Sequence, residues 1–599
     1  MLRNASHHAR RNLDVFLNCH HLPACHTRIP LNISGARFAS AASTTSRTNA
    51  ASAEPGKRFR SKHYNPASAQ PSSTKKPLEP HVLSARLKTL CDGGRINDAI
   101  SLLKNSPLDA QNVPTWNTLI WECMKAKKFQ VAYDLYADMK RRGFSPTSRT
   151  FKTMLSGLAR IENWPDYPKQ LKNATSLYEA FLRHVDSVKK HDASSPELNT
   201  APIASYIQIL GDVGMHQEIF DVFYNMDNEG PLAPDHLLFT AMFQALAAKP
   251  DPVTGYAPNS ASAKLLWSLM IKAQRKTQFP LDSHLISAAV LALSRGRPGD
   301  QESGFQIVRD YFGLSTTTLP KSKDTVPLTP QAFGAVLSLC KFSEKHQSAI
   351  DFFQQVLERP APVGGPSIID NGHVETVIGA YSALSSPNYS IKCIELLEWM
   401  LRESVTRPRD TKIRPSHSTY LLVLKACWSC ADWRGATKTF DLMTGYHCHD
   451  FMDGVVSDRP RFDRRSEGRN ISPDPETVSL MVRTAVRTKN RAHIRQALRL
   501  THYLGMKDLF LNKYAPEGSG QSKKATDSRL FYSLKLADAV KEGIEQVLAE
   551  STGKEQPRKD DVVRWKELER DATDISALAP SDNIIPTISV DKKSSRRRH

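Results

Sequence analysis

The sequence predicts an all-α fold, a right-handed α-solenoid of stacked helix-turn-helix repeats. The first reason is a recurrent spacing, in which a bulky apolar residue is followed sixteen positions later by a small or aliphatic one. The second reason is a methionine that often stands seven positions after that second residue. A spacing that recurs over most of a chain indicates an array of repeats, each of which packs mainly on its neighbours.

The strict form of the spacing gives the pairs Leu83/Ala99, Trp116/Ala132, Ile203/Ile219, Phe333/Ala349 and Tyr420/Ala436. The methionine follows in Ala132/Met139, Ile219/Met226, Ala263/Met270, Cys393/Met400 and Ala436/Met443. We expect the bulky residue to fit between two helices and the small residue to let their axes approach. The methionine lies two turns later on the same face, where its flexible side chain fills a gap.

The clearest unit spans residues 113–147. Apolar residues at three- to four-residue spacing predict two helices, one carrying Trp116, Leu119, Ile120 and Cys123 and the next carrying Ala132, Leu135, Tyr136 and Met139. Residues 125–128 form a polar turn, and Gly143 and Pro146 end the second helix. Each helix is apolar on one face, so the pair must stack on neighbouring pairs to bury both faces.

This unit resembles the pentatricopeptide repeat family. The resemblance rests on Trp116-Asn117-Thr118-Leu119-Ile120, Ala132, Met139, Gly143 and Pro146. A tetratricopeptide repeat is the near alternative, but it begins with Trp-x-x-Leu-Gly-x-x-Tyr, which this unit lacks. The resemblance implies a solenoid of pentatricopeptide-like repeats that binds single-stranded RNA and is not an enzyme.

About ten units in this register cover residues 81–510. They begin near Val82, Val113, Ser148, Thr200, His236, Asp282, Gln331, Asn371, His417 and Glu476. Several units are stretched, and their insertions are rich in Pro, Gly and charged residues. We expect surface loops there, at residues 250–262, 315–327 and 445–470. The resemblance is strong in one unit and weak in most others.

The flanking segments differ in composition from the repeats. Residues 1–39 resemble a mitochondrial targeting presequence, because Arg, Ser and Ala are frequent and Asp14 is the only acidic residue up to Ala53. A chloroplast presequence is the alternative, since the composition suits both. Residues 40–80 predict a disordered linker, 511–575 a helical cap and 576–599 a disordered basic tail.

The charge balance favours a polyanion as partner. The chain has 81 Lys and Arg against 61 Asp and Glu, a net charge of +20, and binding to nucleic acid would release counterions. Basic organellar proteins without a specific ligand are the alternative. No apolar run is long enough to span a bilayer. Nine cysteines do not predict disulfides, because Cys91, Cys123, Cys340 and Cys427 fall on expected buried helix faces.

Several patterns imitate catalytic or metal sites. His373-Val374-Glu375 followed by Cys427-Trp428-Ser429-Cys430 is similar to a zinc deaminase signature, but both segments belong to first helices of repeats and Ala426 replaces the expected proline. Asp560 and Asp561 lie in a charged helical stretch rather than in a nuclease scaffold. The spacing of Cys427, Cys430, His447 and His449 is one that a zinc site could use. Cysteines in a helix and histidines in a polar loop explain the same residues without a metal. We expect no catalytic residue, no metal and no cofactor.

The resemblance implies that two positions of each unit face RNA bases: the residue after the bulky one and the last residue of the unit. In the clearest unit these are Asn117 and Thr147, and the amide is expected to pair with U or C. The other candidates are Ser84, Lys152, Thr240 and Ser479. We do not expect every unit to read a base, because the same position holds Ala204, Ile286, Gly334, Glu375 and Leu421 elsewhere.

A second set of candidates is basic and lies near the ends of the first helices: Lys125, Arg160, Lys249, Arg295 and Arg487. Stacked units would place these side chains along one edge, where they could neutralise phosphates. The alternative is that they complement the helix dipoles and the last carbonyls.

Together these features predict a protein of the mitochondrial matrix that binds single-stranded mitochondrial mRNA or rRNA. Its role would be to support the stability, processing or translation of organellar transcripts. The alternative is a structural or assembly component of the mitochondrial ribosome that contacts rRNA and protein. Neither role requires a cofactor, a small-molecule substrate or a membrane span.

Overall fold

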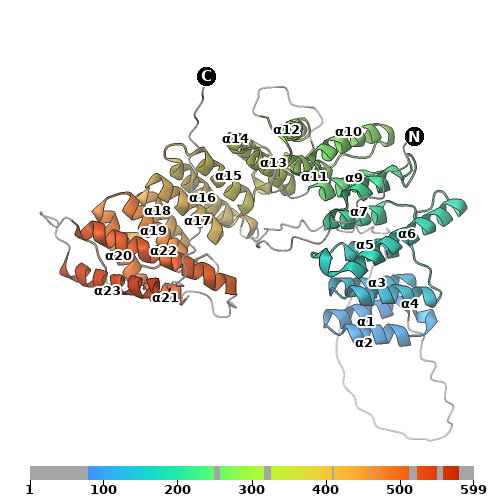
Figure 1. Cartoon of the computed structure of the whole chain (residues 1–599), viewed down its shortest axis with the longest axis horizontal. Coiled ribbons are helices and arrows are strands. Elements are labelled where there is room, and N and C mark those ends of the chain that lie inside the picture. The colour runs from blue at the N-terminus through green and yellow to red at the C-terminus, as the bar shows by residue number, and fades with distance from the viewer. Residues whose placement is uncertain are drawn as a thin grey trace, which may run out of the picture. The chain divides into compact units, whose positions relative to one another are not determined.

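The computed structural model of the chain describes residues 79–247, 257–315, 326–407, 411–457, 459–466, 469–511, 523–549 and 558–578 (Figure 1). Regular structure in these ranges is helical, apart from one isolated bridge between Tyr446 and Phe462. No helix there has both the length and the apolar character needed to cross a membrane. The expected presequence, nearly all of the expected linker and most of the expected basic tail lie outside the described residues.

Helices of the repeat units alternate between two layers, termed A and B. The A helices are α1 (Pro80–Asp92), α3 (Val113–Lys125), α5 (Ser148–Leu158), α7 (Ala201–Val213), α9 (His236–Leu246), α11 (Ser283–Ser294), α13 (Pro330–Phe342), α15 (Asn371–Leu384), α17 (His417–Cys430) and α19 (Pro475–Arg487). Each expected unit start lies within two residues of the first residue of an A helix. The spacing of bulky and small residues therefore located the units along the chain.

The B helices follow their A helices in antiparallel pairs. They are α2 (Ile96–Asn105), α4 (Phe129–Arg141), α6 (Pro168–His191), α8 (His216–Tyr224), α10 (Ser260–Thr277), α12 (Pro298–Phe312), α14 (His346–Glu358), α16 (Tyr389–Thr406), α18 (Trp433–Thr444) and α20 (Arg491–Leu504). Gly143 ends the hairpin of α3 and α4 with a φ of 87°, a left-handed conformation that favours glycine.

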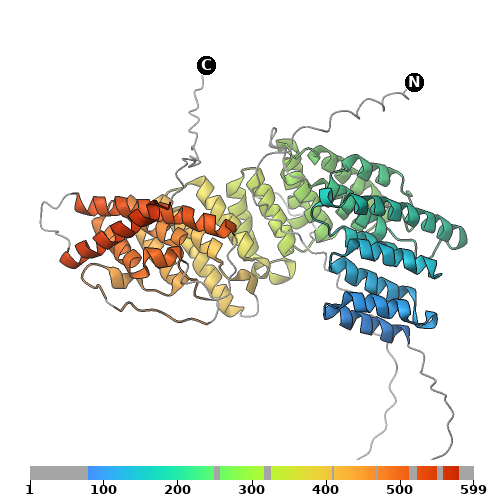
Figure 2. The same ribbon diagram turned by 60° about the horizontal axis from the view of Figure 1, so that its bottom comes forward.

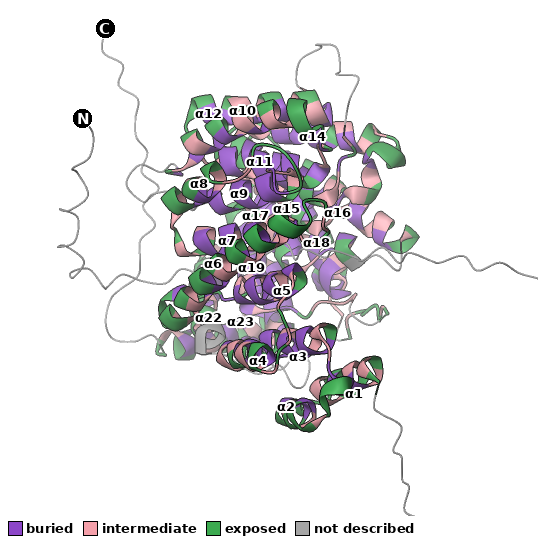
Figure 3. Ribbon diagram, turned by 90° about the vertical axis from the view of Figure 1, so that its right-hand side faces the viewer, coloured by how far each residue is buried: buried purple, intermediate pink, exposed green. Residues whose placement is uncertain are grey.

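Consecutive A helices pack side by side from α1 to α19, and each B helix packs against the A helix of its own unit (Figures 1 and 2). We term this series the A-helix row. The A helices are largely buried between their neighbours, whereas the B helices carry many exposed residues (Figure 3). The prediction of an α-solenoid of helical repeats is confirmed.

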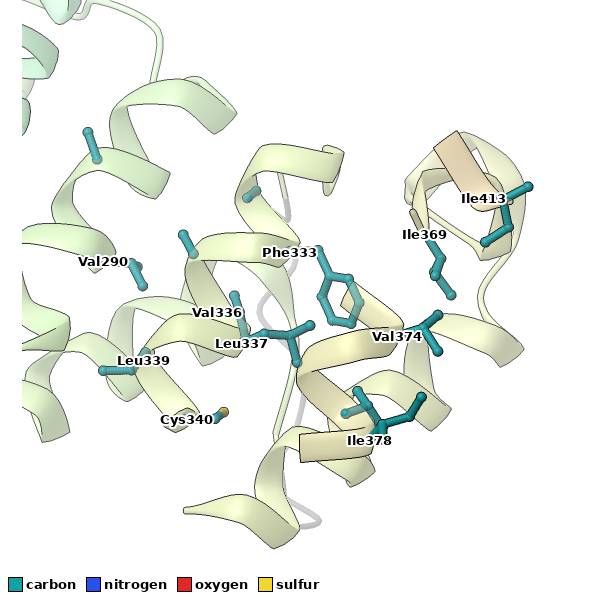
Figure 4. Close-up of a cluster of buried hydrophobic side chains, with 14 of the residues drawn as sticks. Val290, Phe333, Val336, Leu337, Leu339, Cys340, Ile369, Val374, Ile378 and Ile413 are labelled. Atoms are coloured by element: carbon teal, nitrogen blue, oxygen red, sulfur yellow. The ribbon is translucent and has the colours of Figure 1, made fainter. Parts of the chain in front are cut away.

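Apolar burial between the two layers follows the predicted spacing. Every residue of the five strict pairs is at most 4% exposed. The methionines Met139, Met270, Met400 and Met443 are fully buried, while Met226 is only half-buried. Between units, Phe333 and Leu337 of α13 lie on the side that faces Val374 and Ile378 of α15 (Figure 4). The core is thus continuous from one unit to the next.

Polar contacts connect the N-terminal ends of neighbouring A helices. Ser84 Oγ donates to Thr115 Oγ1 at 3.2 Å, and Thr200 Oγ1 donates to Asp235 Oδ2 at 2.8 Å. The Oγ atoms of Ser283 and Thr329 are 3.1 Å apart. Asp235 and Thr329 also belong to a set of N-cap residues, whose side chains accept from backbone N–H groups that have no partner within the helix. Such caps are Asn112, Asp235, Asp282, Thr329, Asp370, Ser416 and Asp474.

Three further helices follow the last unit: α21 (Met506–Phe510), α22 (Lys523–Leu548) and α23 (Lys559–Ser576). Helix α22 packs along α19 and α20, and α23 packs on α22 and α20. A side chain in place of Gly543 would come within 3.3 Å of Ile494, so α22 approaches α20 closely. The helix therefore covers the side of α19 that a further unit would otherwise cover.

A buried ion pair fastens α23 to the last unit. Arg499 is 4% exposed, and its Nη2 lies 2.7 Å from the carboxylates of both Asp561 and Asp453. Asp561 is 2% exposed, and Arg499 Nη1 also donates to Phe451 O at 3.1 Å. Hydrogen bonds to these carboxylates outweigh burial and raise the pKa of Arg499. The guanidinium thus ties together α20, α23 and the segment between α18 and α19.

The substitution Arg499→Met is expected to loosen this end of the chain, because it leaves buried Asp561 without its main partner. Breaking a buried pair in this way destabilises by about 3–5 kcal/mol. Hydrogen exchange followed by mass spectrometry should show lost protection in α20, α22 and α23 and unchanged protection in α1–α9. The control Lys392→Met removes an exposed ion pair with Glu395 and should change protection little. Unaltered protection of α23 in Arg499→Met would contradict the role of Arg499 in holding α23 on the last unit.

Candidate nucleic-acid interface

One stripe of each A helix is left uncovered by the neighbouring helices. In α3 this stripe consists of Pro114, Thr118, Trp121 and Lys125, which are exposed or half-buried and lie at helical spacing. We term the corresponding surface of the A-helix row its open face. Lys125 lies at the C-terminal end of the stripe, where its Nζ is 2.6 Å from Glu122 Oε2. The open face is the surface on which an extended ligand would contact several units in succession.

Asn117 lies beside this stripe and is 6% exposed. Its Oδ1 atom is buried and has no hydrogen-bond partner among the described residues. An unpaired buried acceptor costs about 1–3 kcal/mol. Packing within the described residues therefore leaves this acceptor unsatisfied.

The other predicted base-facing residues are mostly engaged within the protein. Thr240 is 8% exposed and donates to His236 O at 2.6 Å. Thr147 caps α5 in a capping box with Thr150, and Ser84 contacts Thr115 as described above. Lys152 is half-buried, and Ser479 is 2% exposed with an unpartnered Oγ. Ser84, Thr147 and Thr240 thus already use their hydroxyl groups in contacts within the protein.

Three of the predicted phosphate-binding arginines stack on aromatic rings of a neighbouring A helix. Arg160 lies over the ring of Trp121 at 5.6 Å, and Arg295 lies over that of Phe342 at 4.5 Å. Arg487 lies 5.3 Å above Trp428. Each ring belongs to the C-terminal part of its helix, so the contacts confirm that these ends are adjacent. Lys249 lies outside the described residues.

Stacking orients each guanidinium without neutralising it, because a ring attracts a cation through its quadrupole rather than through a net charge. Trp428 holds a second guanidinium, that of Arg483, at 4.2 Å. Burial lowers the pKa of Arg483, and the charge of nearby Arg487 lowers it further. The C-terminal edge of the A-helix row therefore carries fixed positive charge, which can bind the phosphates of a strand.

The aromatic partners were not identified from the sequence. Trp121, Phe342 and Trp428 stand near the ends of their helices and not at the bulky position of the recurrent spacing. The signal that would have found them is an aromatic residue in the last turns of one A helix together with an arginine at the end of the adjacent one. Such a pattern joins residues of two units, and periodicity within one unit does not show it.

Glu375 occupies the base-facing position of its unit, and its carboxylate links two A helices. Ser416 Oγ and Thr419 Oγ1 donate to Glu375 Oε1 at 2.9 and 2.8 Å. Asn371 Oδ1 accepts from the same Thr419 hydroxyl at 2.7 Å. In this unit the position therefore holds α15 against the N-terminus of α17.

The residues of the deaminase-like and zinc-like patterns have structural roles. His373 is 5% exposed; one ring nitrogen contacts Asp370 N at 3.0 Å and the other lies 2.9 Å from Pro330 O. Burial raises the pKa of the Cys427 thiol well above its usual range, which disfavours the thiolate that binds metals. His447 Nε2 lies 3.1 Å from Asp463. Within the described ranges no group of three His, Cys, Asp or Glu residues is arranged to hold a metal ion.

Residues 111–160 match the PPR repeat family. The chain contains a pentatricopeptide repeat at these residues. The matched segment contains α3, α4 and α5, and it includes Asn117, Trp121, Lys125 and Arg160. The unit that most closely resembled the family in its sequence is therefore the one that the family matches.

The chain is also similar to pentatricopeptide repeat proteins of known sequence or structure. It is 21% identical over 368 residues to a chloroplastic pentatricopeptide repeat-containing protein of Arabidopsis thaliana, covering 53% of this chain and 42% of the relative. The chain thus spans less than half the length of that relative. Among solved structures it is similar to the maize pentatricopeptide repeat protein PPR10, with 13% identity, a TM-score of 0.36 and coverage of 83% of this chain and 68% of PPR10.

A second structure of PPR10, in complex with an 18-nt psaJ RNA element, gives 13% identity and a TM-score of 0.35. The match covers 84% of this chain and 70% of that one.

Proposed function

We propose that the protein binds single-stranded RNA along the open face of the A-helix row and acts without catalysing a reaction. The observation that carries the proposal is the unpartnered Oδ1 of Asn117, which stands at the base-facing position of the unit that matches the family. An amide offers both a donor and an acceptor to the edge of a base. RNA-specific recognition commonly targets unpaired bases in this way.

Positive charge on the same row supports the proposal. Arg160, Arg295 and Arg487 are held at the C-terminal edge by stacking, and the chain has a net charge of +20. Phosphate contacts of this kind provide affinity that is largely independent of sequence, while base contacts provide selectivity. With one amide oxygen that has no partner within the protein and several oriented cations, the protein would hold a strand firmly and select few of its bases.

The proposed location is the mitochondrial matrix, where the protein would support the stability, processing or translation of organellar transcripts. The support is the arginine-rich, nearly acid-free composition of residues 1–39. A strand lying on the row is covered on one side, so nucleases and competing base pairing are excluded there. This mechanism requires no cofactor.

A scaffold of the mitochondrial ribosome is the second candidate, and one observation favours it. Glu375 and Thr240 stand at base-facing positions, yet their side chains are satisfied within the protein. Units of this kind offer RNA their backbone and their charge, but no side chain that is available to hydrogen-bond a base. They suit contacts with the backbone of structured rRNA and with ribosomal proteins.

Replacing Arg160 and Arg487 together by Gln is expected to weaken RNA binding, because two phosphate contacts are lost. For a single strand, each contact contributes about 0.7 to the slope of log affinity against log salt, so the slope should fall by about 1.4. Fluorescence anisotropy with a labelled single-stranded RNA over a salt series measures this. Arg402→Gln on the B helix α16, an exposed arginine, is the matched control. An unchanged slope in the double variant would exclude the phosphate role.

Asn117→Ser is expected to change which base is preferred opposite this unit while leaving the fold intact, since Oδ1 makes no hydrogen bond that the change removes. A good amide pair discriminates between bases by about 1–3 kcal/mol, so the preference for U or C should change about tenfold. Selection from a randomised RNA pool, followed by sequencing, reads the preference. An identical footprint for both proteins would count against base reading by Asn117.

A fluorescently tagged full-length protein is expected to accumulate in mitochondria, and deletion of residues 1–39 should leave it outside them. Gradient sedimentation of organelle lysates then separates the two candidate roles. Crosslinked recovery of one or two transcripts away from ribosomes supports transcript binding. Stable comigration with the small ribosomal subunit, resistant to digestion of mRNA, supports the scaffold. Accumulation in another compartment would refute the mitochondrial location.

A further inference from the structure

A cavity of about 220 Å³ lies beside the A-helix row, where the C-terminal ends of α16 and α18 meet the start of α17. Its floor is apolar and is formed by Leu401, Val405, Leu442 and Ile471, with Tyr420 beneath. Val405 is 61% exposed, which is high for an aliphatic residue next to a cavity. The volume is sufficient for one aliphatic side chain together with a short length of backbone.

The cavity depends on the segment between α18 and α19, which is longest in this unit. Arg465 of that segment donates to Asp441 O at 2.9 Å and to Leu442 O, and so covers the last carbonyls of α18. Ile471 N donates to Met443 O at 2.9 Å. These bonds hold the wall of the cavity against the repeat, so the site is a feature of this one unit rather than of the repeat in general.

Three arginines line the cavity, and Arg465 is already bound to the carbonyls at the end of α18. Arg414 and Arg469 are both half-buried, and neither forms an ion pair among the described residues. The nearby carboxylates are otherwise engaged, because Glu403 pairs with Arg407 at 2.6 Å and Asp463 pairs with His447 at 3.1 Å. The positive charges of Arg414 and Arg469 are therefore not balanced by an ion pair among the described residues. Two such charges beside one apolar floor indicate an anion attached to an apolar group.

We propose that this cavity binds the carboxyl-terminal end of a partner protein whose last residue is aliphatic. The terminal carboxylate would lie between Arg414 and Arg469, which present donors in a planar fork that suits carboxylates. The aliphatic side chain would rest on Leu401, Val405 and Ile471. Peptide capture through the charge of a terminal carboxylate is a recurring mode of recognition.

The chemistry of the lining favours a peptide over a nucleotide. Tyr420 is 3% exposed and its hydroxyl donates to Leu442 O at 3.4 Å, so its ring offers no face on which a base could stack. Ser404 Oγ already donates to Leu401 O at 2.8 Å and is not free to read a base edge. An aliphatic floor instead gains from burying a leucine or isoleucine side chain.

The test uses the full-length protein and a fluorescein-labelled peptide of sequence GSGDEDLL with a free carboxyl terminus. Saturable binding by anisotropy is expected for this peptide, and at least tenfold weaker binding for the same peptide amidated at its terminus. The double substitution Arg414→Gln and Arg469→Gln should also weaken binding at least tenfold. Val405→Glu should weaken it by placing a carboxylate in the apolar lining of the cavity, where it would repel the terminal carboxylate of the peptide.

Arg464→Gln is the matched control, since Arg464 is an exposed arginine of the same segment that does not line the cavity. It should bind the peptide as the parent protein does. Equal binding of the free and amidated peptides, or no saturable binding at millimolar concentration, would overturn the proposal. So would a single-stranded RNA whose binding is lost in the double variant while peptide binding is unaffected, because the cavity would then belong to the RNA surface.

Discussion

The fold depends on one constraint, which is that a hairpin of two helices cannot bury both of its apolar faces by itself. Trp116 closes the space between α3 and α4, and Ala132 lets the helices approach, but the other side of α3 remains apolar until α1 and α5 cover it. The stability of each unit therefore resides largely in its contacts with its neighbours. Polar contacts at the helix starts, such as Thr200 with Asp235, add directional bonds that set how each unit lies on the next.

The same constraint explains how much of the fold the sequence predicted. Each hairpin requires a bulky residue and a small one at a fixed separation. The pattern is therefore local and can be recognised within a short stretch of sequence. The starts of the A helices and the burial of pairs such as Phe333 and Ala349 followed from it. Met226 is only half-buried, because α8 is short and ends at Tyr224, before the methionine.

The candidate interface was predicted less completely, because its geometry joins residues of different units. The arginines at the helix ends were found from charge and position, but the rings on which they stack were not. Nothing in a single unit indicated that the Glu375 carboxylate would accept hydrogen bonds from Ser416 and Thr419 of the next unit. Nor did it indicate that Oδ1 of Asn117 would be buried without a partner. Such outcomes depend on the relative placement of two helices that the periodicity alone does not fix. The cavity beside Arg414 likewise requires an inserted segment that lies outside the repeat pattern.

Helix α22 has a consequence for how molecules of this protein can associate. Subunits that join head to tail through unlike faces form open filaments unless the contacts close into a ring. The bare side of a terminal helix in a stacked array is such a face, since it is apolar and shaped to receive another copy of the same kind of helix. By lying along α19, α22 covers that face within the described residues, so the first repeat of another molecule cannot stack on α19 in the way that one unit stacks on the next.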